Sequence, residues 1–403
     1  MTRVIAPRRP SVIPRMPALA ALLAFAPAAA AHAAESPVPT ETSRRQGEAG
    51  RMEDSEKVLD LGLAYTADIW HNSGGAKPGW RYLDNLDVIV GADLDAAVGW
   101  HGARLFAYGL YNNGHSLSDL TGDAQAASNI ETGVEAFRLY EAWIEQDFGA
   151  GASVKLGLYD LNSEFDALYA SALFISSAHG IGTDISQSGR NGPSIFPVTS
   201  LALRVEAKVS DEVTARFAVL DGVPGDPDHP RRTAIKLGHG DGAFAIGEAD
   251  WRHGKLRLIG GAWGYTRELE RHGLSGTAPS HGAYLRGEME LLSGDRGKVS
   301  VFGRLGMASG AVNMFSGFAS AGVTLDLTDD WQFGAAIAHA RTSHDYRRAT
   351  SAGPAETSIE LTAAKAITPW LSLQPDVQYV IDPSAAPGVD DALVAGLRVT
   401  VSL

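Results

Sequence analysis

Residues 200–209, SLALRVEAKV, decide the fold class, because apolar and polar side chains alternate along the whole stretch. Successive side chains of a strand point to opposite sides, so Arg204 and Glu206 share one face while leucine and valine share the other. Residues 390–403 repeat the alternation and finish on an apolar residue, Leu403. Both stretches predict strands with one apolar and one polar face.

The spacing of such segments after residue 57 indicates the architecture. Sixteen are expected, at 58–70, 82–95, 102–113, 134–148, 152–160, 199–209, 212–220, 243–251, 255–267, 281–292, 298–308, 315–327, 331–341, 356–365, 370–380 and 390–403. The gaps alternate between about 6–38 and about 2–6 residues. A soluble β-sandwich would use the same side-chain alternation but would not sort its loops by length, whereas outer-membrane barrels have short periplasmic turns and long outer loops. We therefore predict an all-β fold, a 16-stranded antiparallel transmembrane β-barrel with both termini periplasmic.

The composition fits this architecture and excludes others. No stretch after residue 40 offers about 18 consecutive apolar residues, which argues against membrane helices. The chain has 45 glycines and no cysteine, so neither a disulfide framework nor a Cys-ligated metal site is possible. Aromatic residues gather near the ends of the expected segments, as in the interfacial girdles of membrane barrels, although ordinary core aromatics are the alternative.

The N-terminus resembles an export signal. Four arginines precede an apolar, alanine-rich run and the sequence AHA, which predicts a signal peptide at 1–33. A single anchoring helix is the alternative, but the run is short and contains Pro27. Residues 34–56 are expected to be a flexible lead-in, and 57–403 the barrel. Loss of 1–33 removes four arginines and no acid, so the net charge changes from -13 to -17.

The third outer gap, 161–198, is by far the longest expected loop. Loops of this length in compact folds are functional or disordered. Residues 165–177 are apolar enough to predict a short helix, and the glycines and prolines that follow indicate an ordered coil. An apolar loop would be a liability on an acidic outer surface. We therefore expect it to fold into the barrel and constrict the pore.

Several stretches resemble the carbohydrate-selective porins, the OprB family. They are YLDNLDVIVGADL (82–94), GWHGARLFAYGLYNNG (99–114), SNIE (128–131), RLYEAWIEQDF (138–148), GLYDLNSEFD (157–166), LFISSAHG (173–180), ITPWLSLQPDVQYVIDP (367–383) and AGLRVTVSL (395–403). The middle of the chain, about 221–355, carries little of this likeness. The resemblance implies passive diffusion of glucose and similar sugars, mono- or oligosaccharides, through a narrowed polar channel.

Candidate pore-lining residues follow from what a neutral sugar needs. It needs hydrogen-bonding groups that replace its water and a flat face to slide on, and each site must be weak enough to release it. Trp143 or Tyr159 would offer the flat face. Charges that only pair with one another along a wet wall are the alternative. The candidates are Arg104, Asn129, Glu131, Arg138, Glu141, Trp143, Glu145, Tyr159, Asn162, Glu164, Asp184, Arg190, Arg204 and Glu206.

One strand complicates that assignment. Arg138 and Glu141 are separated by an odd step, so a regular strand cannot aim both side chains into the lumen. A β-bulge would re-aim part of the strand.

Other functions find little support in the sequence. No nucleophile elbow, phosphate loop or zinc-protease motif occurs, so we expect no catalytic residue, metal or cofactor. The DGVPGDPDH stretch (221–229) would suit calcium, but a solvated acidic loop is the simpler interpretation. The acidic charge argues against nucleic-acid binding and against a phosphate channel. A porin for other small polar or charged solutes and an exported sugar-binding β-protein remain as alternatives. The expected partners are sugars, outer-membrane lipid and, for a homotrimer, further copies of the chain.

Overall fold

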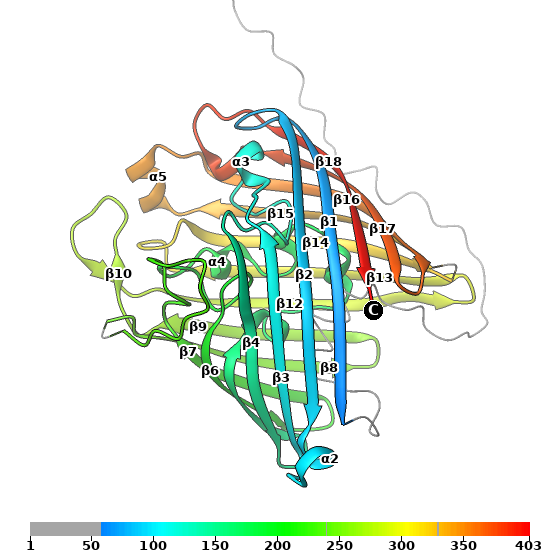
Figure 1. The fold of residues 1–403 in the computed structure, drawn as a ribbon. Helices are drawn as coiled ribbons and strands as arrows, with labels where there is room; N and C mark the ends of the chain where they lie inside the picture. The colour runs from blue at the N-terminus through cyan, green and yellow to red at the C-terminus, as the bar shows by residue number, and fades with distance from the viewer. Residues whose placement is uncertain (1–57, 239, 329) are drawn as a thin grey trace, which may run out of the picture.

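The computed structural model describes residues 58–238, 240–328 and 330–403, in which sixteen antiparallel strands close into a barrel (Figure 1). The predicted fold class is confirmed. The predicted signal peptide at 1–33 and the lead-in at 34–56 lie outside the described residues. None of the helices in the described part of the chain is long and apolar enough to cross a membrane.

Each strand pairs with its neighbours in chain order, and β1 closes the barrel against β18, with Asp68 opposite Arg398. The barrel strands are β1 Leu59–Gly74, β2 Gly79–Asp93, β3 Ala103–Asn113, β4 Glu135–Asp147, β5 Ala152–Tyr159, β6 Ser200–Lys208, β7 Val213–Asp221, β8 Ala243–His253, β9 Leu256–Tyr265, β12 His281–Gly294, β13 Gly297–Ala308, β14 Phe315–Leu327, β15 Trp331–Thr342, β16 Ala355–Thr368, β17 Leu371–Ile381 and β18 Ala392–Ser402. A closed sheet leaves no unpaired edge in the hydrocarbon of a membrane.

Short elements lie in the connections between barrel strands. The strands β10 (Leu269–Glu270) and β11 (Thr277–Ala278) form a small hairpin between β9 and β12. The helices are α2 Leu94–Val98, α3 Ser118–Thr121, α4 Thr183–Ser186 and α5 His344–Thr350. One-turn 3₁₀ helices lie at Leu161–Ser163, Ala170–Leu173, Ser177–His179 and Pro383–Ala385.

The alternation seen in the sequence sets which side chains face inward. On β6, Leu203 is 46% exposed on the outside, whereas Arg204 is 2% exposed inside the barrel. The same alternation holds along β1 and β18, where the even-numbered residues point inward. The apolar outer surface is the one that lipid would cover, and the polar face lines the lumen.

The first outer connection is shorter than the sequence predicted. A gap at 71–81 was expected, but β1 continues to Gly74 and β2 begins at Gly79. The Asn72 side chain closes the turn by donating from Nδ2 to the carbonyls of Gly74 at 3.0 Å and Lys77 at 2.9 Å. Polar and glycine residues that resembled a loop therefore extend two strands and their tight turn.

A bulge in β4 is confirmed. Tyr108 of β3 lies opposite Glu141, while the next residue, Gly109, lies opposite Leu139. Tyr140 is therefore the extra residue, and both it and Glu141 are buried. The bulge shifts the inward series by one, so Arg138 and Glu141 both project into the barrel despite their odd separation.

The loop that joins β5 to β6, residues 160–199, packs inside the barrel; we call it the third loop. Phe165, Phe174 and Ile185 belong to the largest buried apolar cluster, together with wall residues such as Phe302. The single helix expected at 165–177 does not form. Asp166 has a positive φ of 52°, which breaks the helical run, and only separate short turns follow.

Candidate functional site

Wall carboxylates hold the third loop by accepting backbone N–H groups. Glu248 of β8 accepts from Asp166 at 2.8 Å, and Glu288 of β12 accepts from Ala170 at 2.8 Å. Glu360 of β16 accepts from two successive loop residues at 2.6 and 3.1 Å. Charge-assisted hydrogen bonds of this kind are stronger than neutral ones. The loop is thus attached to the wall at three separated points.

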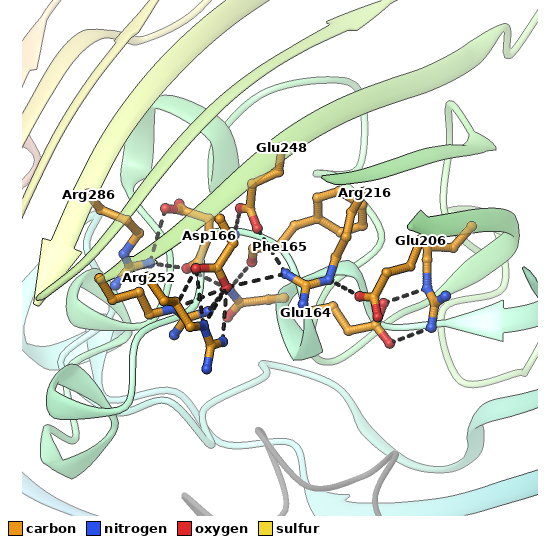
Figure 2. Close-up of polar contacts among 12 residues, drawn as sticks. Glu164, Phe165, Asp166, Glu206, Arg216, Glu248, Arg252 and Arg286 are labelled. Atoms are coloured by element: carbon orange, nitrogen blue, oxygen red, sulfur yellow. Dashed lines mark hydrogen bonds and ion pairs between the residues drawn. The ribbon is translucent and has the colours of Figure 1, made fainter. Parts of the chain in front are cut away.

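A buried ion cluster fixes the centre of the loop. The Asp166 carboxylate, fully buried, pairs with Arg286 at 3.0 Å and with Arg304 at 2.9 Å. Arg304 also reaches Asp184 at 2.5 Å. Figure 2 shows Asp166 beside Arg286 and below Glu248. Buried charges are tolerated only when they are paired and hydrogen-bonded, so this cluster depends on the loop staying in place.

The second outer loop, residues 114–134, is held in the same way. Glu356 of β16 accepts the N–H groups of Ala124 at 2.8 Å and Gln125 at 3.0 Å. Within the loop, Glu131 accepts from the N–H of Leu117 at 2.6 Å and from Ser118. Burial raises the pKa of Glu131 to about 7. Glu131 therefore shapes this loop from within.

Alternating charges follow the wall from β3 to β12, and we call this series the charge ladder. Its members are Arg104, Glu145, Lys155, Glu164, Arg204, Glu206, Arg216, Glu248, Asp250, Arg257 and Glu288. Figure 2 shows Arg216 between Glu248 and Glu206. Each charge of the ladder lies within ion-pair distance of an opposite charge.

Glu164 of the third loop joins the ladder to the loop. Its carboxylate meets Lys155 at 2.6 Å and Arg204 at 2.7 Å. Burial alone would raise its pKa, but the two cations hold the pKa of Glu164 well below its usual range. The Arg204 guanidinium also binds Glu145 at 2.6 Å. The charged groups of Lys155, Glu164, Arg204 and Glu145 are therefore occupied by contacts with one another.

The neighbouring part of the wall differs, because β18, β1–β4 and the two loops enclose an open pocket. The pocket has a volume of about 90 Å³, room for several water molecules. None of its lining side chains among the described residues is a lysine, arginine or histidine. The lining residues are Ala64, Thr66, Asn85, Asp87, Tyr108, Asn129, Ile130, Tyr140, Glu141, Asp160, Ser163, Phe196 and Thr400.

Three carboxylates shape this pocket, and neutral groups bind them. Tyr108 donates its hydroxyl to Asp87 at 2.7 Å, and Tyr140 donates to Asp160 at 2.7 Å. Glu141 accepts from the N–H of Asp160 at 3.1 Å. Burial raises the pKa of Asp160 to about 6, against the opposing effect of the Tyr140 hydrogen bond.

The structure sorts the sequence candidates into groups. Glu141 and Asn129 line the pocket. Arg104, Glu145, Glu164, Arg204 and Glu206 belong to the charge ladder.

The remaining charged and amide candidates lie outside both groups, and two of them, Glu131 and Asp184, hold the second and third loops as described above. Arg138 donates to the Pro230 carbonyl at 2.7 Å. Asn162 bonds the Phe165 carbonyl at 3.1 Å inside the third loop. Arg190 is half-exposed and meets Asp241 at 3.4 Å.

The two aromatic candidates are already covered by protein. Trp143 stacks on Phe106 with ring centroids 4.9 Å apart, and the Nζ of Lys155 lies 4.0 Å from its ring centre. Tyr159 is buried and donates to Glu164 at 2.8 Å. A different aromatic residue of the third loop, Tyr169, is 60% exposed.

Sequence reasoning did not single out Asn85, Asp87, Tyr108, Tyr140 and Asp160. Asn85 and Asp87 are two apart on β2 and therefore share its inward face. The alternation of side chains along this strand could therefore have identified both residues from the sequence. Tyr140 could not be identified from the alternation, because the bulge changes which residues of β4 face inward. The loop anchor Asp166 could not be recognised because its partners lie more than 100 residues away.

The acidic stretch at 221–229 forms surface ion pairs. Asp226 meets Lys236 at 2.8 Å and His229 at 3.1 Å, and hydrogen bonds from these side chains lower the pKa of Asp226 to about 2. Within the described ranges, no group of three or more His, Asp or Glu side chains is arranged to hold a metal ion.

Known proteins share both the sequence and the architecture. Residues 77–403 match a family described as "Carbohydrate-selective porin, OprB family". Porin B of Pseudomonas aeruginosa is 25% identical, in an alignment that covers 94% of this chain and 96% of that relative. The high-pH structure of OprB from Pseudomonas putida has a TM-score of 0.77 at 20% identity, covering 86% of this chain and 94% of that one. An anion-selective porin from Comamonas acidovorans, at 11% identity and a TM-score of 0.55, shares the fold over 86% of this chain and 99% of its own.

Proposed function

The chain belongs to the OprB family of carbohydrate-selective porins of the Gram-negative outer membrane, and on that premise we propose that monosaccharides cross it between the β1–β4 wall and the two inward loops. The observation that carries this route is the pocket, which lies where the second and third loops approach that wall. Its small volume argues against a long oligosaccharide as the solute held there.

The proposed route gives each wall a different task. The charge ladder and the wall carboxylates hold the loops, so the lumen stays narrow without a moving part. The pocket offers hydroxyl, amide and carboxylate groups that replace part of the water around a sugar. Because these groups lie on one side of an open passage, contact stays weak enough for release.

The third loop, 161–198 in the sequence prediction, is proposed as the constricting element. Three wall glutamates and the buried Asp166 cluster support this role, since they keep the loop away from the outer surface. Among the predicted pore-lining residues, we propose Glu141 and Asn129 as solute contacts.

The barrel exterior supports two further parts of the proposal. Its exposed leucine, valine and isoleucine side chains would contact outer-membrane lipid. On the outside of β1 and β2, Tyr65 donates to Asp84 at 2.8 Å, a polar patch that would be costly in lipid and suits contact between copies in a homotrimer. An unheated gel compared with a heated one tests this assembly. We also propose that the channel carries no catalytic activity.

Liposome swelling tests the proposed function. Purified protein should let glucose enter faster than a disaccharide of similar chemistry, because a single ring fits beside the loops. Liposomes without protein are the control. Equal rates for both sugars, with the barrel folded, would show a general pore without sugar selection.

A further inference from the structure

The pocket on the β1–β4 wall has a one-sided chemistry. It presents the carboxyl groups of Asp87, Glu141 and Asp160, and no cationic side chain of the described chain lines it. The nearby Lys155 does not line the pocket, although its charge acts on Glu141; its Nζ lies 2.6 Å from Glu164 and 4.0 Å from the centre of the Trp143 ring. The pocket therefore offers its occupant mainly hydrogen-bond acceptors and negative charge.

Two amide oxygens in the lining also indicate that the pocket accepts hydrogen bonds from its occupant. Asn85 is 5% exposed and donates through Nδ2 to Asp87 at 2.8 Å, while its Oδ1 accepts no hydrogen bond from any described residue. The Oδ1 of Asn129, across the pocket on the second loop, is also without a donor in the described chain. Buried acceptors without donors are costly, and a donor-rich ligand would satisfy them.

The two tyrosine donors of the pocket are already used. The hydroxyl groups of Tyr108 and Tyr140 each carry one proton, and both are donated to carboxylates. A neutral sugar would find acceptors for its hydroxyl protons but few donors for its oxygens. An ammonium group brings three donors and no acceptor, which matches the lining more closely.

Aromatic rings near these carboxylates also suit a cationic ligand. Tyr108 and Tyr140 meet edge to face with centroids 5.0 Å apart, and Phe196 lies 6.2 Å from Tyr140. Aromatic faces attract cations and also pack against apolar sugar faces. Carboxylates beside rings thus suit a ligand that combines a positive charge with a carbon ring.

We infer that this pocket recognises the ammonium group of an amino sugar, a monosaccharide in which an amine replaces a hydroxyl. The inference rests on the proposed sugar route and narrows its substrate class. A bare metal ion fits less well, because no three carboxylate or histidine side chains of the described residues are arranged to hold one.

Uptake of labelled sugars into proteoliposomes tests the inference. Glucosamine, glucose and N-acetylglucosamine are compared at pH 7 in symmetric salt, which shunts the movement of charge. We expect the half-saturating concentration to be roughly tenfold lower for glucosamine than for the two neutral sugars, because hydrogen bonds to charged groups are the stronger ones. Glucosamine should also inhibit glucose uptake, and methylammonium, which lacks the ring, should inhibit it much less.

Substitutions test whether the pocket causes the preference for glucosamine. Asp87→Asn and Glu141→Gln should each bring the three sugars to within about twofold of one another. Asp228→Asn, an exposed acid of the outer loop between β7 and β8, is the matched control and should keep the preference. If a pocket variant fails to fold, the competition experiment on the unmodified protein decides.

The outcomes separate the two proposals. Equal half-saturation for glucosamine and glucose, with glucose uptake intact, overturns the amino-sugar inference and leaves the sugar porin standing. Inhibition by methylammonium as strong as that by glucosamine also overturns it. Ion conductance without uptake of any sugar overturns the proposed function itself.

Discussion

The ion-paired part of the lumen wall and the pocket use the same acidic residue types in different ways. From β5 to β13, arginines and carboxylates pair with one another or with the third loop, as Arg304 does with Asp166. On β1–β4, no cationic side chain of the described residues lines the pocket that Asp87, Glu141 and Asp160 shape, and neutral groups donate to these carboxylates. The difference shows that a charged wall is not uniform: ion pairs hold the third loop, and the pocket carboxylates line the space that a solute would enter.

The largest expected effect comes from removing the ion pairs that hold the third loop. Asp166→Ala removes the partner of two buried guanidinium groups, which should cost about 3–5 kcal/mol and release the loop. We expect a lower temperature for heat-modified gel migration and a higher single-channel conductance. Asp241→Asn, which breaks the more exposed pair with Arg190, should change neither by much. Unaltered conductance with Asp166→Ala would mean that the cluster does not hold the loop.

Removing part of the third loop distinguishes its effect on the width of the pore from its effect on the stability of the barrel. Deletion of 183–191 takes away α4 and the contact between Asp184 and Arg304. We expect conductance to rise in a planar bilayer while the barrel still forms, because the strands pair without this segment. If conductance stays the same, the loop does not narrow the pore.

The next effect falls on the side of the pocket. Glu141→Ala should reduce glucose flux several-fold in liposome swelling, with a smaller loss of stability than Asp166→Ala. Arg138→Ala removes a contact to the Pro230 carbonyl rather than a pocket residue, so its effect on flux should be smaller. Equal flux for both variants and the unmodified protein would remove Glu141 from the passage.

The smallest effect is a dependence on pH. Burial raises the pKa of Asp160 to about 6, so this carboxyl takes up a proton as the pH falls from 7.5 to 5 and the pocket loses negative charge. The neighbouring Glu141 can only add to that loss. Reversal potentials in a salt gradient should therefore show weaker cation preference at pH 5. Asp160→Asn should already be weaker at pH 7.5 and change less, and an equal pH shift in that variant would assign the effect elsewhere.

Much of the barrel could be predicted because its information is local. Alternation along 200–209 fixes which side chains face inward, and loop lengths fix the two ends. The tight turn after Gly74 escaped prediction because the Asn72 side chain closes it, and composition does not reveal that hydrogen bond.

The site was harder to predict because its geometry is not local. The sequence allowed a bulge in RLYEAWIEQDF, but only pairing with β3 shows that Tyr140 is the extra residue. Whether a charge is paired depends on partners far along the chain, as with Asp166 and Arg304. Ladder and pocket residues therefore look alike in the sequence.

The most direct test of sugar selection is planar-bilayer conductance with glucose as a blocker. A single channel should show current that falls as glucose is added and saturates, because a sugar held beside the loops obstructs ions. A disaccharide should block less. Current that is insensitive to glucose at every concentration, in a channel that is otherwise open, would contradict a sugar-selective passage.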